Sequence, residues 1–294
     1  MLLVVNPAAA GGRLGREWPR HEARLRELGL VAPVVTTREP GHATEIAEAA
    51  AREGTGVVVA VGGDGTTDEV VQGLHRAGRG VLGILPLGTG NDTASGLGIP
   101  VELEAAARLL LDGPRRRADL MRVGDDHVVL NAIGIGLLGD INERAVAFKK
   151  VRGIAGYLLA AAVSIFRFCT PEVRLTTPTT EYRGPMTILA VHGGPTTGGG
   201  FALAPEANPF DGLLDACLVT RLPAWRRPAR LLAALRGSLH RAPEATMLRE
   251  PWLELEFAEP LVCHLDGNGA RLTPPRLRIE VLPGALEVVA PPTS

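Results

Sequence analysis

A glycine-rich loop is the first stretch of this sequence whose residues could do chemistry. In "VGGDGTTDEVV" (61–71), Gly62, Gly63 and Gly65 surround Asp64 directly behind an apolar run. Such a loop leaves backbone N–H groups bare, and at the start of a helix these groups favour a phosphate. Because Asp64 would repel phosphate, its carboxylate would orient the loop or reach a Mg²⁺ that bridges phosphates. A glycine-rich turn with Asp64 as a helix cap is the alternative.

Two further loops have the same character. "PLGTGND" (86–92) follows the next apolar run, and "NPAAAGG" (6–12) follows the first one. Ligands on parallel sheets bind at the carboxyl ends of the strands, so three such loops at one edge favour a ligand site over simple turns. Neither "GxxxxGK[ST]" nor a correctly placed "GxGxxG" occurs in them, which disfavours a P-loop NTPase and a Rossmann dehydrogenase.

The elements that position these loops follow from an alternation in the first 120 residues. Apolar, strand-like runs at 2–7, 31–37, 56–63 and 80–88 alternate with helical spacing at 14–30, 42–54, 66–78 and 102–113. This pattern predicts an α/β domain with a parallel sheet covered on both faces. Thr66 and Glu69 have the spacing of a capping box at the start of the third helix.

The pattern changes near Asp119. Short strand-like runs divided by Gly, Pro and Asp follow, with helical stretches near 142–168 and 224–241. This texture predicts an all-β second domain of the sandwich type. The expected fold class is therefore α/β plus all-β, with the α/β domain at 1–119 and the β-sandwich at 120–275. The last segment, 276–294, is expected to return to the first domain.

Charge and cysteine content limit the function classes. The chain holds 31 Lys+Arg and 32 Asp+Glu, so no global field points to nucleic acid. The cysteines at 169, 217 and 263 show neither a metal spacing nor a disulfide framework, which fits a reducing, cytoplasmic location.

One apolar stretch, 153–168, is the segment of the chain that most resembles a membrane segment. It falls short of the ~20 residues needed to span a bilayer. With Lys149, Lys150 and Arg152 beside it, it could instead make a peripheral contact with an anionic membrane surface. A buried core helix is the alternative. An apolar edge strand in the second domain would also allow a homodimer.

Taken together, "NP" at 6–7, "GGDGTTDEVV" and "PLGTGND" resemble the catalytic domain of the diacylglycerol kinase and sphingosine kinase family, which includes bacterial lipid kinases. "FALAPEANPFDGLLDACLV" (201–219) and "LDGN" (265–268) extend the resemblance over most of the chain. It implies a kinase that uses ATP and Mg²⁺ to phosphorylate a hydroxyl of a diacylglycerol-, sphingoid- or related lipid. The nucleotide and the lipid substrate would meet in the cleft between the two domains.

The resemblance also implies site residues. Those that would bind the nucleotide are Asn6, Thr37, Gly62, Gly63, Asp64, Gly65, Thr66, Gly88, Thr89 and Asn91, with Glu69 supporting the loop. A structural Mg²⁺ would be held by Asp211 and the carbonyls of Asn208 and Leu213, although an ordinary Asp-Gly turn is an equal alternative. Asp92 and Asp119 are further carboxylates that could lie near the Mg²⁺ of the nucleotide.

Phosphoryl transfer needs a carboxylate that accepts the hydroxyl proton, and Asp266 in "HLDGNG" is the candidate. The sequence departs from the family at Asn268, where the family has a glutamate, and an amide cannot take a proton. His264 could lie in the same cleft, and His192 precedes a glycine-rich loop; packed histidines are the alternative for both.

Two other functions stay open. "GGDG" also occurs in NAD kinases, whose "DGQ" resembles "DGN", so the chain could be an NAD kinase-like phosphotransferase on a soluble substrate. With Asn268 in place of glutamate, it could also be a nucleotide-binding regulator with impaired catalysis.

Overall fold

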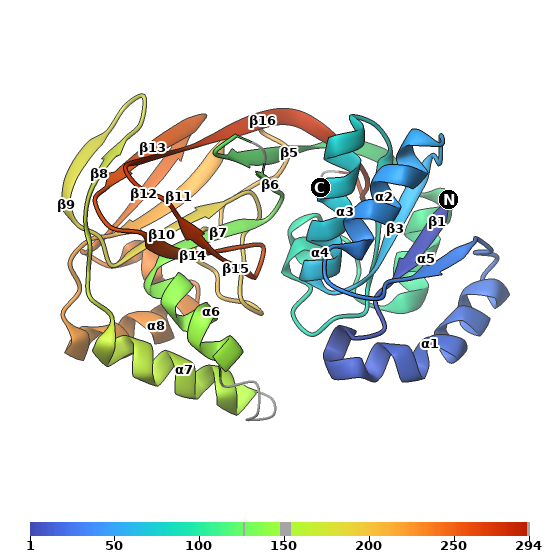
Figure 1. Cartoon of the computed structure of the whole chain (residues 1–294), viewed down its shortest axis with the longest axis horizontal. Coiled ribbons are helices and arrows are strands. Elements are labelled where there is room, and N and C mark those ends of the chain that lie inside the picture. The colour runs from blue at the N-terminus through green and yellow to red at the C-terminus, as the bar shows by residue number, and fades with distance from the viewer. Residues whose placement is uncertain (126, 148–153, 293–294) are drawn as a thin grey trace. The chain divides into compact units, whose positions relative to one another are not determined.

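The computed structural model describes the whole chain except residues 126, 148–153 and 293–294 (Figure 1). The chain divides into two compact units. Unit 1 comprises Met1–Leu120, Pro209–Asp211 and Leu282–Ser294, and unit 2 comprises Met121–Asn208 and Gly212–Val281. The domain limits expected from the sequence stay a prediction.

Unit 1 contains a parallel sheet. Its strands are β1 (Leu2–Val5), β2 (Val34–Thr36), β3 (Val57–Gly62), β4 (Val81–Pro86) and the end of β16 (Arg276–Val289), in the order β2-β1-β3-β4-β16. β3 and β4 are buried along their whole length, as expected for valine-rich strands covered on both faces. The predicted parallel α/β architecture is confirmed.

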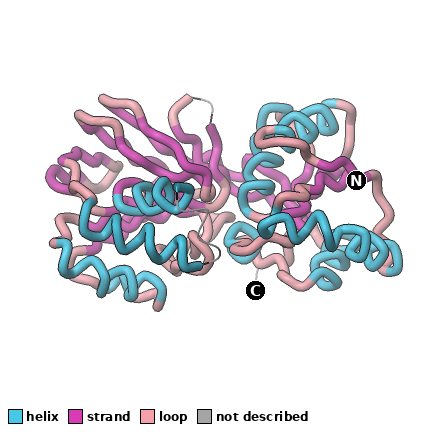
Figure 2. Tube along the Cα trace, turned by 60° about the horizontal axis from the view of Figure 1, so that its bottom comes forward, coloured by secondary structure: helices cyan, strands magenta, loops and turns pink. Residues whose placement is uncertain are grey.

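Helices cover this sheet (Figure 2). They are α1 (Ala9–Glu27), α2 (His42–Arg52), α3 (Asp64–Ala77), α4 (Asp92–Gly96) and α5 (Leu103–Asp112). Val57, Val59 and Val61 form one core with residues of α1 and α5, such as Leu14 and Leu110. The alternate residues of β3 point to the opposite face, because strand side chains alternate.

The start of α3 differs from the sequence expectation. The helix begins at Asp64, its N-cap is Gly63, and no side chain caps it. The predicted Thr66–Glu69 capping box is therefore wrong, because Thr66 already lies inside the first turn. Glu69 instead accepts hydrogen bonds from the backbone N–H groups of Gly41 (2.9 Å) and Ala43 (3.1 Å), where α2 begins.

Unit 2 is built from antiparallel strands. They are β5 (Arg115–Val123), β6 (His127–Val129), β7 (Ala132–Gly136), β8 (Glu172–Thr176), β9 (Glu181–Pro185), β10 (Ile188–His192), β11 (Leu214–Val219), β12 (Ala245–Glu250), β13 (Trp252–Phe257), β14 (Leu261–Leu265), β15 (Asn268–Leu272) and the first part of β16; β5 begins in unit 1. A six-stranded sheet has the order β12-β11-β10-β7-β14-β15, and β16, β13, β8 and β9 pair beside one another. Ile133 and Leu189 of the first layer share a core with Leu255 and Ile279 of the second, which confirms the predicted sandwich.

Helices pack on the other face of the six-stranded sheet. They are α6 (Leu137–Ala147), α7 (Ile154–Arg167) and α8 (Arg227–Leu235), with short 3-10 turns η1 (Ala224–Arg226) and η2 (Leu239–Arg241). Ile141, Ala161 and Ala234 share a core there with Ala190 and Cys217 of the sheet. No helix in the described part of the chain is both long and apolar enough to cross a membrane. Lys149, Lys150 and Arg152, singled out for a membrane contact, lie outside the described residues.

Candidate functional site

The glycine loops after β3 and β4 touch each other through their backbones. A Cβ atom on Gly88 would lie 2.3 Å from the Cα of Gly63, and one on Gly63 would lie 3.2 Å from the Cα of Gly88. A Cβ on Gly62 would lie 2.4 Å from Oγ1 of Thr66. Any side chain at these positions would therefore push the two loops apart or displace the first turn of α3. The absence of side chains at these glycines lets the two loops touch, and it also lets a ligand approach the backbone closely.

The loop after β1 is joined to the same place by Asn6. Its Nδ2 donates to Oγ1 of Thr66 (3.0 Å), and its Oδ1 accepts the N–H of Ala8 (3.0 Å). The chain then passes through left-handed conformations at Ala10 (φ 51°), Gly11 and Gly12 before α1 continues. Three loops that the sequence singled out thus meet around the start of α3.

Asp64 ties the β3 loop to the β4 loop. Its Oδ1 accepts the backbone N–H of Thr93 (2.9 Å) in the first turn of α4. Asn91 has a left-handed backbone (φ 58°), and its Oδ1 accepts the N–H of Gly88 (3.0 Å). The role of Asp64 at a nucleotide stays a prediction. Thr89, at the tip of the loop, is exposed.

Thr37 and Glu69 lie on neighbouring elements of unit 1. Thr37 is nearly buried, and its N–H donates to the carbonyl of Val5 (2.8 Å), which extends the pairing of β2 with β1. Glu69 joins α3 to the start of α2 through the two bonds already described. It therefore supports the segment around Gly41 rather than its own loop.

The loops and the start of α3 fit a phosphate chain. Gly63 is the N-cap of the 14-residue helix α3, and no side-chain hydrogen bond caps the first turn. Uncapped N–H groups at a helix N-terminus, together with the helix dipole, stabilise negative charge.

The segment predicted to hold Mg²⁺ is the turn at 208–213. Within unit 1, the carbonyl of Pro209 accepts the N–H of Asp119 (2.8 Å), and the guanidinium of Arg116 lies 3.4 Å from the ring centre of Phe210. The Asp119 carboxylate accepts the N–H of Gly284 (2.7 Å). These bonds fix the turn to β5.

The predicted ligand set consists of one carboxylate and two carbonyl groups, which are the hard oxygen donors that Mg²⁺ prefers. Among the described residues, no cluster of three His, Cys, Asp or Glu side chains could hold a metal. A site at this turn would therefore depend on backbone oxygens, and the predicted ligands stay a prediction.

Asp266 forms a tight hairpin turn between β14 and β15. Asp266 (φ 44°) and Gly267 (φ 84°) both have positive φ, as a type I′ turn requires. The Asp266 carboxylate accepts backbone N–H bonds from Leu130 (3.0 Å), Asn131 (3.1 Å) and Ala132 (2.7 Å). Its oxygens are thus held at a fixed place beside the start of β7. These hydrogen bonds could not be predicted from the sequence, because the partners lie more than 130 residues away.

Asn268 lies directly after this turn, opposite Leu265 in the hairpin, and it is exposed. The preceding carbonyl, that of Gly267, accepts a bond from Nδ2 of Asn142 (3.0 Å) on α6. The position where the family has a glutamate is therefore open to solvent in unit 2.

His192 and His264 are fully buried side chains on two strands that flank β7. A Cβ on Gly134 would lie 2.1 Å from Nε2 of His264, so the imidazole occupies the space above a glycine. Burial lowers the pKa of His192 to about 4, and burial together with the nearby His192 lowers the pKa of His264 to about 4. Both are neutral at physiological pH, as the packed-histidine alternative expected.

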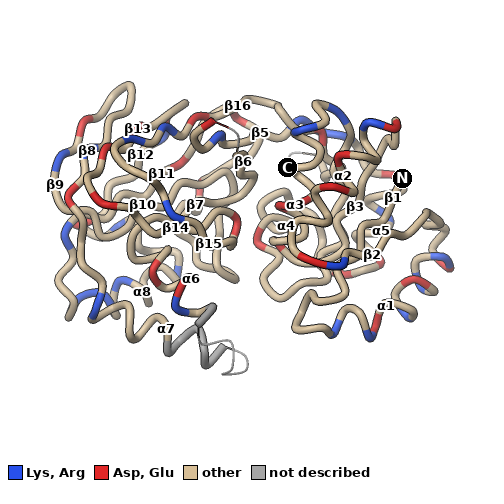
Figure 3. The backbone as a smooth tube through the Cα atoms, in the orientation of Figure 1, with Lys and Arg blue, Asp and Glu red and all other residues tan. Residues whose placement is uncertain are grey.

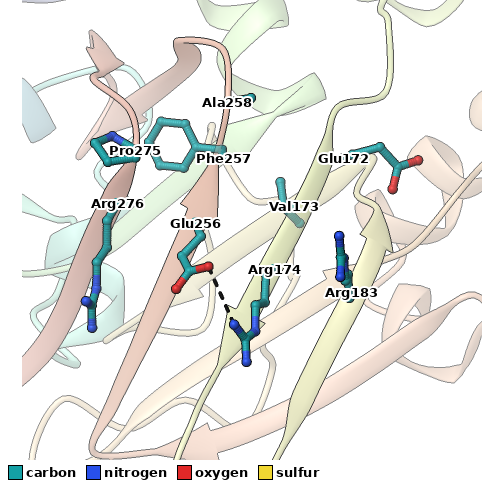
Figure 4. Close-up of a pocket in the computed structure, with 9 residues that line it drawn as sticks. All are labelled: Glu172, Val173, Arg174, Arg183, Glu256, Phe257, Ala258, Pro275 and Arg276. Carbon is teal, nitrogen blue, oxygen red and sulfur yellow. Dashed lines mark ion pairs between the residues drawn. The ribbon is translucent and has the colours of Figure 1, made fainter.

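A wide groove of about 720 Å³ opens elsewhere on unit 2, across β8, β9 and β13 (Figure 4). It contains none of the predicted site residues. Arg174 is paired there with Glu181 and Glu256, and Arg276 is paired with Glu254.

Comparison with known proteins agrees with this geometry. Residues 1–123 match the model of the diacylglycerol kinase catalytic domain, and residues 131–290 match that of the YegS C-terminal NAD kinase beta sandwich-like domain. A protein of Pseudomonas aeruginosa described as "Probable lipid kinase YegS-like" is 37% identical over 296 residues, which cover 99% of this chain and 94% of that protein. A protein of Chromohalobacter salexigens with the same description is 35% identical over 91% of this chain and 86% of its own.

A crystal structure from Bacillus anthracis, described as that of "a putative diacylglycerol kinase", has a TM-score of 0.81 and 26% identity. The match covers 99% of this chain and 97% of that one. These similarities confirm the resemblance drawn from the three loops. The chain therefore belongs to the family of YegS-like lipid kinases that carry a diacylglycerol kinase catalytic domain, and it is a lipid kinase.

Proposed function

We propose that this lipid kinase transfers the γ-phosphoryl group of ATP, bound with Mg²⁺, to a hydroxyl of a diacylglycerol-, sphingoid- or related lipid. The backbone contact between Gly63 and Gly88 is the observation that carries the proposal. It joins two bare loops at the uncapped start of α3, within the residues that match the diacylglycerol kinase catalytic domain. Backbone N–H groups arranged in this way suit a polyphosphate.

Each part of the site has a task in this proposal. Asn6 and Asp64 hold the three loops together through their bonds to Thr66 and Thr93, so that the nucleotide meets a preformed cradle. Mg²⁺, when bound, would neutralise the charge of the phosphates. Asp211, with the carbonyls of Asn208 and Leu213, would hold a structural Mg²⁺.

Asp266 is the proposed acceptor of the proton. As the lipid oxygen bonds to the γ-phosphorus and the bond to ADP breaks, the hydroxyl proton would pass to the carboxylate of Asp266. The backbone N–H groups of Leu130, Asn131 and Ala132 fix that carboxylate in place. We also propose a cytoplasmic location. A transient contact with the membrane is part of the same proposal, because such lipid acceptors reside in bilayers. A homodimer stays a prediction.

A catalytically impaired regulator is the second candidate. It is favoured by Asn268, which is exposed beside the Asp266 turn and cannot act as a base. It predicts that ATP binds and that no acceptor is phosphorylated.

A turnover assay tests these alternatives. Purified protein is incubated with labelled ATP, Mg²⁺ and mixed micelles of diacylglycerol, sphingosine or related lipids, with NAD as a parallel acceptor. We expect label in at least one lipid and none in NAD. Label in NAD alone would move the assignment to an NAD kinase-like enzyme, and ATP binding without any transfer would favour the regulator.

Two variants then assign the base. Asp266→Asn should lower kcat by at least about a hundredfold, the usual contribution of a general base. Asn268→Glu restores the family glutamate and should raise kcat if that glutamate takes part in the reaction. An active Asp266→Asn enzyme together with a strongly activated Asn268→Glu enzyme would transfer the role to position 268.

A further inference from the structure

An apolar stripe lies on the outward face of the segment 221–241, which contains η1 and α8. Trp225, Leu232 and Leu235 expose 72%, 46% and 49% of their surface. The exposed Pro228 and Ala229 lie between them at helical spacing. A helix turn brings positions three and four apart onto one face, so these residues form a continuous apolar surface.

This stripe is not a core face that has lost its partner. The opposite side of the segment is already anchored, because Ala234 of α8 and Leu239 of η2 are buried in the core under the six-stranded sheet. Arg227 is also buried, and its guanidinium donates to the carbonyls of Leu222 (3.0 Å) and, on α7, Ile165 (2.7 Å). The segment is therefore fixed from behind while its outer face stays apolar.

The charge around the stripe is positive, although the chain as a whole is nearly neutral. Residues 221–241 contain no Asp or Glu. They contain six arginines, at positions 221, 226, 227, 230, 236 and 241. Glu244 pairs with Arg226 and Arg230. Blue Lys and Arg segments accordingly gather around α8 in Figure 3.

A further exposed aromatic lies on the neighbouring helix. Phe166, 68% exposed, belongs to α7, which lies beside α8 in Figure 1 and is joined to it through Arg227. With Ala162 and Val163 it lines a shallow hollow of about 530 Å³ bordered by Arg144 and Arg167.

We propose that the face formed by 221–241 docks on the surface of an anionic phospholipid bilayer. Trp225, Leu232 and Leu235 enter the interfacial region, and Arg236 and Arg241 lie at the headgroups. An anchored helix with an apolar face and a basic border is the form of an interfacial membrane helix, and its charge complements anionic lipid. The inference rests on the proposed function in one respect only: a bilayer-resident acceptor gives the docking a purpose.

Vesicle sedimentation tests the docking face. The full chain should bind vesicles of phosphatidylglycerol and phosphatidylcholine in equal parts, and bind pure phosphatidylcholine much less. Changing Trp225, Leu232 and Leu235 together to Gln, which keeps helix propensity, should weaken binding at least about tenfold. A matched control changes the exposed Val31, Val101 and Leu111 of unit 1 to Gln and should bind as the wild type.

The contribution of the arginine charges to binding and the depth to which Trp225 enters the bilayer are measured separately. Arg236→Gln with Arg241→Gln should weaken binding about tenfold, and added salt should do the same. Brominated lipids should quench the fluorescence of Trp225, and Trp225→Phe should remove that quenching while most of the binding remains. This single substitution still decides the question if the triple variant fails to fold.

Several outcomes would overturn the proposal. These are vesicle binding that ignores lipid charge, a folded triple variant that binds like the wild type, and no quenching by brominated lipids. A triple variant that binds vesicles normally but changes from dimer to monomer would assign the stripe to a second copy of the chain.

Turnover separates this inference from the proposed function. On a short-chain diacylglycerol dissolved in water, the triple variant should match the wild type, and on the same lipid class in anionic vesicles it should lose most of its activity. If neither the wild type nor the triple variant phosphorylates the dissolved or the vesicle-bound lipid, the proposed function fails. Vesicle binding still decides whether the docking face is correct.

Discussion

At the scale of single residues, the contact between Gly63 and Gly88 is a sensitive point of the proposed nucleotide site. Gly88→Ala would place a methyl group 2.3 Å from the Cα of Gly63, so the two loops must separate. We expect kcat/KM for ATP to fall at least about a hundredfold, since small displacements of a positioned substrate are costly. Steady-state kinetics measures this, and Gly56→Ala, where an added methyl group meets no atom within 4 Å, is the control. Equal kinetics of both variants would show that the loops need not touch.

The two buried histidines predict a pH dependence of stability. An unfolded histidine titrates near 6.5, whereas the pKa values of His192 and His264 in the folded chain are about 4. Between these values the unfolded chain binds more protons, so the free energy of unfolding falls as the pH is lowered from 6.5 to 4. By pH 4 the loss is on the order of 3 kcal/mol for each histidine.

Urea unfolding at a series of pH values measures that loss. His192→Asn and His264→Gln should each make the slope shallower over this range, even if they lower the stability at pH 7. A wild-type protein with constant stability from pH 6.5 to 4 would contradict the prediction.

At the scale of elements, Glu69 couples two helices of unit 1. Its carboxylate on α3 accepts the N–H groups of Gly41 and Ala43 at the start of α2. Glu69→Ala leaves these donors without their acceptor and should lower the free energy of unfolding by about 1 kcal/mol, as the loss of a helix cap does. Thermal unfolding measures the change, and Glu53→Ala, at the exposed end of α2, is the control. Similar melting temperatures for both variants would show that solvent replaces the cap without cost.

The elements of unit 1 show what the sequence can and cannot predict. The alternation of valine-rich runs with helical spacing predicted the parallel sheet, because burial on both faces leaves a clear pattern. The capping box was wrong because Gly63 already ends the strand and starts the helix, so Thr66 lies too far inside α3 to be a cap. α4 was missed because a five-residue helix shows too little periodicity to detect.

The residues of the candidate site were likewise predicted from the sequence only in part. The three glycine loops were found because glycine and asparagine are distinctive behind a strand. The partners of Asp64 and Asp266 were not found, since bonds to Thr93 and to Leu130–Ala132 join segments that are distant in sequence. Likewise, the outward stripe of α8 was missed because helical spacing alone does not tell which of two apolar faces meets the core.

At the scale of the whole molecule, β16 serves both units. Its first part pairs with β13, and Glu287 and Val288 pair in parallel with β4. The buried Leu286, Val288 and Val289 add to the core of unit 1. A chain that ends at Val281 loses these side chains, each worth about 1.5–3 kcal/mol, which together approach the whole stability of a typical domain.

We therefore expect the truncated chain to lose ATP binding and to show no cooperative unfolding of unit 1. Fluorescence-detected thermal unfolding with and without ATP measures both effects. A chain that lacks only residues 293–294 is the control. Retention of ATP binding by the truncated chain would show that β4 is stable as an edge strand.

The shared strand also sets an order of events during synthesis. The first 120 residues leave the ribosome long before residues 282–294, so β4 emerges as an unpaired edge next to a valine-rich sheet. Exposed edges of this kind pair readily with other chains. The nascent chain must therefore keep its first unit unfinished, or shielded by chaperones, until the last strand is released. The loops at the ends of β1, β3 and β4, which form the proposed nucleotide site, would then mature only when translation ends.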